Sequence, residues 1–130
     1  MELLAPRGHF SYIVSNKWLR ARYGEPLRRW LKGKRVVELV DFGSLPVFDV
    51  SAYPCILRVD AGVPNEAFQA ATVDSLAFDD LAAKVRSLSF WVDQVPLNDN
   101  GWALVDRETR NLLEKLQRTG IPLEEYVGGR

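Results

Sequence analysis

Few side chains in this sequence combine into a recognisable catalytic set. His9 is the only histidine and begins a predicted strand, and nothing around it supports Ser-His-Asp or Cys-His catalysis. The neighbouring carboxylates at 79–80 and 124–125 would diverge by about 100° on a helix, so neither pair forms a shared acid–base site. The sequence has no P-loop, Gly-rich dinucleotide turn or His/Cys metal cluster. We therefore expect no catalytic, cofactor-binding or metal-binding residue in this chain.

Charge is distributed unevenly along the chain. Residues 1–35 hold nine Lys and Arg against two Glu, a net charge of +7, whereas residues 36–130 hold eight against fifteen acidic residues, a net charge of −7. A basic N-terminal third on an otherwise acidic chain indicates a polarised surface and is one route to contact with a polyanion. The alternative is that these cations lie on ordinary solvated helix faces.

Length and composition are those of a single globular domain. The chain has 130 residues, of which 47% are hydrophobic and 26% charged. One cysteine, Cys55, excludes an intrachain disulfide and fits a reducing compartment. No secretory leader begins the sequence, and no apolar run approaches the roughly 20 residues that span a bilayer. We expect a cytoplasmic protein without membrane contact.

The first sixty residues predict a strand, a helix and two further strands. Residues 9–14 favour a strand covered on both sides, because apolar side chains fall on both of its faces. Ser15 is a plausible N-cap for a short turn through Trp18. Residues 24–34 predict a helix with Pro26 in its first turn. The expected apolar stripe of this helix is Leu27, Trp30 and Leu31.

The next two strands predict an α/β arrangement. Residues 35–42 and 53–59 form apolar runs joined by about ten residues. Gly43, Pro46 and Pro54 argue against a helix in this connection. A long hairpin loop fits there, so the third strand should run antiparallel to the second. The preceding strand–helix–strand order indicates a parallel crossover.

The second half of the chain predicts additional strands and helices. We expect strands over 68–73 and 89–97, a helix that begins near Asp79–Asp80, and a turn at 98–101. Asp106 should cap a helix that runs through Gln117 and ends at Thr119–Gly120. The residues expected on the inward face of that helix are Leu112, Leu113 and Leu116. Residues 1–4 read as the last turn of a helix.

One block resembles a known enzyme family. The segment HFSYIVSNKWLRARYGEPLRRWL (residues 9–31), followed by VVELVDFG (36–43), VF (47–48) and AYPCIL (52–57), resembles TaqI-like, type IIG restriction–modification DNA adenine methyltransferases. More weakly, WAL (102–104) and LLEKLQRTGIPLEEYV (112–127) resemble the family's approach to its DNA-specificity domain.

The resemblance implies a partial Rossmann-like sheet. Residues 1–62 would be the C-terminal half of the catalytic domain, with the fifth, sixth and reversed seventh strands. Residues 63–130 would be an α+β segment that leads to the specificity domain. The family's Gly-containing turn for S-adenosylmethionine and its Asn-Pro-Pro-Tyr motif do not occur in this sequence. We therefore expect a fragment that binds no cofactor and is inactive alone, although the parent enzyme would use S-adenosylmethionine.

The resemblance also implies a role for an aromatic residue in the 43–54 loop. Methylation of a base amine requires the base to leave the stack, and in this family an aromatic between the sixth and seventh strands stacks on it. Phe48 falls at that place. The alternatives are that Phe48 is a packed loop aromatic, or that Tyr53 does the stacking.

Other positions would face DNA if the resemblance holds. Asn16, Lys17 and Trp18 follow the first strand at its carboxyl end, the edge where open α/β sheets bind ligands. They would form the edge of a pocket together with Tyr53. Trp18 could instead pack on the sheet. The cations expected to reach DNA phosphates are Lys17, Arg20, Arg22, Arg28 and Arg29, and the alternative for them is a solvated helix face.

Two functional hypotheses remain open from the sequence. The first is a piece of a DNA adenine methyltransferase that binds DNA weakly and in a salt-sensitive way. The second is a non-enzymatic interaction module that docks a partner chain through an open sheet edge. Under both hypotheses the sheet has an exposed apolar edge, where the first four strands of the family's sheet would pair. We therefore expect an N-terminal methyltransferase half or a second copy of the chain as a partner.

Overall fold

A computed structural model describes residues 5–97 and 101–120. In chain order the elements are β1 (His9–Ser15), the 3₁₀ turns η1 (Asn16–Leu19) and η2 (Arg22–Gly24), α1 (Glu25–Lys32), β2 (Arg35–Asp41), β3 (Pro54–Asp60), β4 (Ala67–Thr72), α2 (Leu81–Leu88), β5 (Phe90–Asp93) and α3 (Arg107–Thr119). The predicted helical turn at 1–4 and most of the predicted turn at 98–101 lie outside the described residues.

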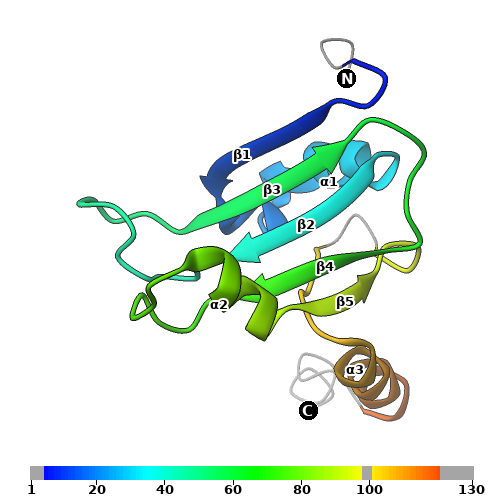
Figure 1. The fold of residues 1–130 in the computed structure, drawn as a ribbon. Coiled ribbons are helices and arrows are strands. Elements are labelled where there is room, and N and C mark those ends of the chain that lie inside the picture. The colour runs from blue at the N-terminus through cyan, green and yellow to red at the C-terminus, as the bar shows by residue number, and fades with distance from the viewer. Residues whose placement is uncertain (1–4, 98–100, 121–130) are drawn as a thin grey trace.

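The strands of the described chain form one sheet with the order β1-β3-β2-β4-β5 (Figure 1). β3 runs antiparallel to both β1 and β2, so β1 and β2 are parallel to each other, joined by a crossover through α1. β4 pairs parallel with β2, and β5 pairs antiparallel with β4. The predicted α/β class and the antiparallel hairpin from 35 to 59 are confirmed. The fold is a mostly antiparallel mixed α/β sheet, compatible with part of a methyltransferase-like domain.

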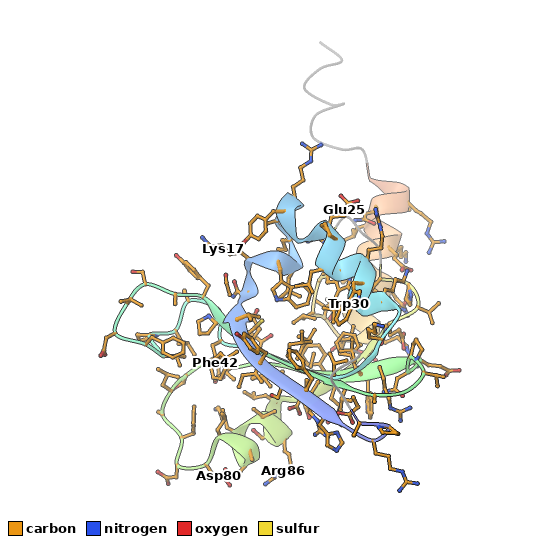
Figure 2. All side chains as sticks on the ribbon, turned by 90° about the horizontal axis from the view of Figure 1, so that it is seen from above. Lys17, Glu25, Trp30, Phe42, Asp80 and Arg86 are labelled. Atoms are coloured by element: carbon orange, nitrogen blue, oxygen red, sulfur yellow. The ribbon has the colours of Figure 1, made fainter. Side chains whose placement is uncertain are left out.

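Helices cover both faces of the sheet. α1 and its 3₁₀ turns lie on one face and α2 on the other, so the labelled Lys17 and Trp30 lie across the sheet from Asp80 and Arg86 (Figure 2). Two apolar clusters fill the interfaces. The cluster on the α1 face includes Trp18, Leu31, Leu39, Leu57, Phe68 and Trp102. The cluster on the α2 face includes Val40, Phe42, Ala71, Val73 and Val85.

β1 is an edge strand, so the prediction that both of its faces are covered is wrong. Phe10, Tyr12 and Ile13 are 37%, 57% and 44% exposed. Phe10 and Tyr12 instead stack on each other, with ring centroids 5.7 Å apart. Among the described residues β1 pairs with β3 alone, which agrees with the expected open apolar edge.

The buried residues of α1 are not all those of the predicted apolar stripe of Leu27, Trp30 and Leu31. Leu31 is fully buried and Leu27 is half-buried, but Trp30 is 44% exposed and lies under the Lys34 ammonium, 5.0 Å from the ring centroid. Arg28 takes the buried place, at 2% exposure. Hydrophobic periodicity assigns Arg28 to solvent, because it cannot foresee backbone carbonyls that a guanidinium will satisfy.

The prediction that the leucines of α3 face inward is also wrong. Leu112, Leu113 and Leu116 are 56%, 41% and 56% exposed. α3 instead meets the sheet through its polar side, since Arg107 and Arg110 donate to the Asp93 carboxylate of β5 at 2.6–3.0 Å. Hydrogen bonds from Arg107, and then the charges of both arginines, outweigh burial and lower the pKa of Asp93.

The predicted boundary at residues 62/63 falls within this sheet. β2 from the first segment and β4 from the second pair over four residues, from Glu38–Gln69 to Asp41–Thr72. The assignment of the two segments to parts of a larger enzyme stays a prediction.

Candidate nucleic-acid interface

A cavity of about 580 Å³ opens at the carboxyl ends of three parallel strands, and we call it the strand-end cavity. The cavity is lined by Asn16, which follows β1, by Asp41 at the end of β2 and by Thr72 at the end of β4. Tyr53, just before β3, also lines it. Ligands of open α/β sheets bind at this edge, because the loops after parallel strands converge there. Of the predicted pocket-edge residues, Asn16, Lys17 and Tyr53 line this cavity.

A short hydrogen-bond network fixes the polar wall of the strand-end cavity. The Asn16 side-chain amide donates to Asp41 Oδ1 at 2.8 Å and more weakly to the Gly43 carbonyl at 3.4 Å. The Gly43 amide donates to the same carboxylate oxygen at 2.9 Å. Gly43 has φ +56°, a conformation that glycine adopts without strain. The turn after β2 therefore holds Asp41 in one orientation.

Phe48 lies in a second cavity, of about 400 Å³, which we call the Phe48 cavity. It shares Lys17 and Tyr53 with the strand-end cavity. The Lys17 ammonium lies 4.9 Å from the Tyr53 ring centroid, so a cation–π contact forms the common wall. Phe48 is 48% exposed and Tyr53 42% exposed. Both aromatic candidates are thus partly exposed and line a cavity that Lys17 also lines.

The predicted DNA-contacting cations do not all lie at the surface. Lys17, Arg20 and Arg22 are exposed, and Lys17 and Arg20 line the strand-end cavity. Arg29 is exposed but forms an ion pair with Glu25 at 2.7 Å. Arg28 is buried, and its guanidinium donates to the carbonyls of Trp18 and Ala21. The expectation that Arg28 reaches DNA is therefore wrong, because this side chain binds the 3₁₀ turns together.

Trp18 packs in the core rather than at the pocket edge. It is 5% exposed and meets Trp102 edge-to-face, with ring centroids 5.5 Å apart. Gly24 touches the backbone of Trp18 so closely that a Cβ there would lie 2.2 Å from the Trp18 carbonyl oxygen. Ser15 caps η1 as predicted, since its hydroxyl accepts from the Lys17 amide. These contacts place Asn16, Lys17 and Arg20 on one rigid turn.

Neither Cys55 nor His9 lines either cavity. Burial, chiefly, raises the pKa of Cys55 to about 11, so the thiol stays protonated and inert at neutral pH. His9 is exposed and contacts the Asp60 carboxylate at 2.7 Å. Among the described residues no group of three His, Cys, Asp or Glu side chains could hold a metal ion, and no helix there is long and apolar enough to cross a membrane.

The sequence did not single out Asp41, which lines the strand-end cavity, or predict the buried contacts of Arg28 with the 3₁₀ turns. Asp41 is the last residue of a strand parallel to β1, so the rule that placed Asn16 at a ligand-binding edge applies equally to it. Arg28 carried no comparable signal, because its two acceptors are main-chain carbonyls 10 and 7 residues away.

Residues 1–48 match the Eco57I restriction-modification methylase family. That stretch covers β1, the 3₁₀ turns, α1, β2 and the loop through Phe48. The chain is also 26% identical over 138 residues to the type II methyltransferase M.PaeR7I of Pseudomonas aeruginosa, covering 96% of this chain and 24% of the relative. The chain thus spans about a quarter of the length of this curated relative.

A solved structure gives a further comparison. A chain from a structural study of complex assembly and conformational transition of the type I R-M system superposes with a TM-score of 0.48 and 13% identity, covering 89% of this chain and 22% of that one. The sequence comparisons confirm the resemblance to restriction–modification methyltransferases. The TaqI-like type, the type IIG class and adenine as target stay predictions.

Proposed function

We propose that this chain is the base-facing part of a DNA adenine methyltransferase of a TaqI-like, type IIG restriction–modification system. The observation that carries the proposal is the coincidence of the 1–48 methylase match with an exposed Phe48 in the loop between β2 and the reversed β3. Phe48 stacks on the adenine that leaves the DNA duplex, and the neighbouring Lys17 meets a phosphate beside it. Tyr53, on the shared wall, limits the depth to which the base enters.

The exposed cations of η1 and η2 supply the sequence-independent part of DNA binding. Lys17 lines both cavities, Arg20 lines the strand-end cavity, and Arg22 begins the next turn of the chain. Arg29 extends the set at the cost of its ion pair with Glu25. If four cations each neutralise one phosphate, the logarithm of the binding constant falls with the logarithm of the salt concentration with a slope of about −3.6.

The residues present do not fit a site for S-adenosylmethionine. The sequence lacks the Gly-containing turn and the Asn-Pro-Pro-Tyr motif with which the proposed family holds the cofactor and the target amine. In the parent enzyme S-adenosylmethionine supplies the methyl group, and another part of that enzyme binds it. This chain contributes base stacking, phosphate contacts and a wall that excludes water.

The test is Phe48→Ala in the assembled enzyme, made from this chain and the polypeptide that carries the missing motifs. Loss of a base–aromatic stack worth about 1–3 kcal/mol lowers methylation about 5- to 150-fold. The matched control is Val50→Ala, which removes a side chain that is 71% exposed in the same loop and should leave methylation unchanged. Intact activity in Phe48→Ala, with thermal unfolding unaltered in both variants, would refute the stacking role.

The exposed edge of β1 favours a second candidate function, the docking of a partner chain. Among the described residues β1 pairs on one side only, so the edge beside Phe10, Tyr12 and Ile13 offers a template for strand addition. The occupant would be an N-terminal methyltransferase half or a second copy of the chain. Sedimentation of the isolated chain tests self-association: the docking role predicts dimers that Tyr12→Lys converts to monomers, and a wild-type monomer at all concentrations excludes the second copy.

A further inference from the structure

The strand-end cavity holds a carboxylate that stacking at Phe48 does not use. Asp41 is half-buried in the cavity wall, and its Oδ1 accepts from both Asn16 Nδ2 and the Gly43 amide. Its other oxygen, Oδ2, accepts no hydrogen bond from any described residue, and no described cation pairs with Asp41. The network thus fixes Oδ1 of a carboxylate that lines the cavity and leaves Oδ2 with its acceptor capacity unused by the described residues.

Other parts of the same cavity are cationic and aromatic. Lys17 and Arg20 both line it, and the Tyr53 ring forms the wall below the Lys17 ammonium. A ligand that satisfies all of these groups carries hydrogen-bond donors for the carboxylate, an anionic group for the cations and a flat ring for the aromatic wall. A nucleotide whose base carries an amine has this distribution, and about 580 Å³ lies within the usual range for small-molecule pockets.

We propose that the strand-end cavity binds a second nucleotide, whose base carries an exocyclic amine that donates to Asp41 Oδ2 while Lys17 and Arg20 meet its phosphate. Carboxylates accept in this way from the N4 amine of cytosine, whereas uracil or thymine would place a carbonyl oxygen against Asp41. Asn16 is a positioning residue, because its amide holds Asp41 and does not need to touch the base.

The second nucleotide site rests on the proposed function, since it places a neighbouring nucleotide of the same DNA strand beside the base at Phe48. The two cavities share Lys17 and Tyr53, so one backbone phosphate between the two nucleotides can meet the shared lysine. In an enzyme with this arrangement, Asp41 selects the base next to the methylated one.

The test is titration of the complete 130-residue chain with cytidine and uridine 5′-monophosphates, followed by NMR chemical-shift changes. Cytidine monophosphate should bind at least about fivefold tighter than uridine monophosphate, and the shifts should fall on residues that line the strand-end cavity. Asp41→Asn keeps an acceptor for Asn16 and Gly43 but turns Oδ2 into a donor, so the preference should reverse towards uridine monophosphate.

Two controls separate base selection from general attraction. Lys17→Gln should weaken both nucleotides by a similar factor, and Asp79→Asn, at an exposed aspartate beside the α2 cap, should change neither. Equal affinities for the two nucleotides, a preference that survives Asp41→Asn, or the absence of saturable shifts at the cavity would each overturn the inference. Phe48→Ala reports on the proposed function separately: a loss of methylation in that variant, together with equal nucleotide affinities in this titration, refutes the second site alone.

Discussion

Gly24→Ala should destabilise the fold although it makes a small change at a position with an ordinary backbone. Gly24 has φ −81° and ψ −6°, which alanine adopts freely. A Cβ at this position would nevertheless lie 2.2, 2.6 and 2.8 Å from the O, Cα and C atoms of Trp18. All three are backbone atoms of η1, so no side-chain rotation relieves the clash, and the turn that carries Lys17 must move.

The size of this effect follows from two opposing terms. Alanine in place of glycine reduces the entropy of the unfolded chain and favours folding by about 0.4–1 kcal/mol. Overpacking of a tightly packed site costs about 1–3 kcal/mol, and more when backbone must shift. We therefore expect a net loss of about 1–2 kcal/mol, which for a chain of this size lowers Tm by roughly 3–8 °C.

Gly33→Ala is the matched control. Gly33 ends α1, and a Cβ there would meet its nearest neighbour, the Trp30 carbonyl oxygen, at 3.6 Å, an ordinary contact. This variant should be as stable as the wild type or slightly more stable. Urea and thermal unfolding of the three proteins measure the difference. Equal stability of Gly24→Ala and Gly33→Ala would refute the close approach of Gly24, at the end of η2, to the backbone of η1.

Three further predictions test the electrostatics of the fold. Arg28→Met should cost about 2–4 kcal/mol in urea unfolding, because it leaves the buried carbonyls of Trp18 and Ala21 without their guanidinium donor; stability within 0.5 kcal/mol of wild type would contradict this role. Asp93→Asn should lower Tm at pH 7, because the folded state lowers the pKa of Asp93. The stabilisation from this carboxylate is present above its unfolded pKa of about 3.9 and is lost as pH falls through its folded pKa. The difference in Tm between wild type and Asp93→Asn should therefore shrink in acid. A difference that stays constant down to pH 2 would exclude this account. Cys55, fully buried with a pKa of about 11, should react with a thiol reagent at pH 8 only at the rate of unfolding, whereas rapid labelling of the native chain would show an open β3.

The parts of the fold that sequence patterns predicted are those that local chemistry determines. Runs of apolar residues located β2 and β3, and the loop between them was too rich in Gly and Pro for a helix, which gave the antiparallel pairing. Asp106 was recognisable as an N-cap, and Asp79–Asp80 marked the start of a helix. In the structure the side chains of Asp80 and Asp106 both accept from backbone amides of the helices they begin.

The failures arose where tertiary context decides burial. β1 has apolar residues on both faces but lies at the sheet edge, so Tyr12 stays exposed. Arg28 lies buried because the 3₁₀ turns present carbonyls to it, and α3 meets the sheet through arginines because Asp93 lies opposite them. Periodicity counts apolar side chains and cannot count such long-range polar partners.

Prediction of the candidate site was similarly divided. Phe48 and Tyr53 were proposed through the resemblance to the methyltransferase family, and Asn16 and Lys17 from the strand-end rule; their roles toward DNA stay predictions. Trp18 belongs to the core, and Asp41 was overlooked because it was counted as part of a buried strand rather than as its end.

The central claim, that Phe48 stacks on a base that has left the duplex, can be measured most directly with the chain and DNA alone. The measurement compares binding of a duplex that carries one adenine opposite an abasic site with binding of the fully paired duplex, by fluorescence anisotropy at fixed salt. The wild-type chain should prefer the extrahelical adenine by at least about fivefold, and Phe48→Ala should abolish that preference while it retains salt-sensitive binding to both duplexes. Equal binding of the two duplexes by the wild type, or an unchanged preference in Phe48→Ala, would contradict the claim.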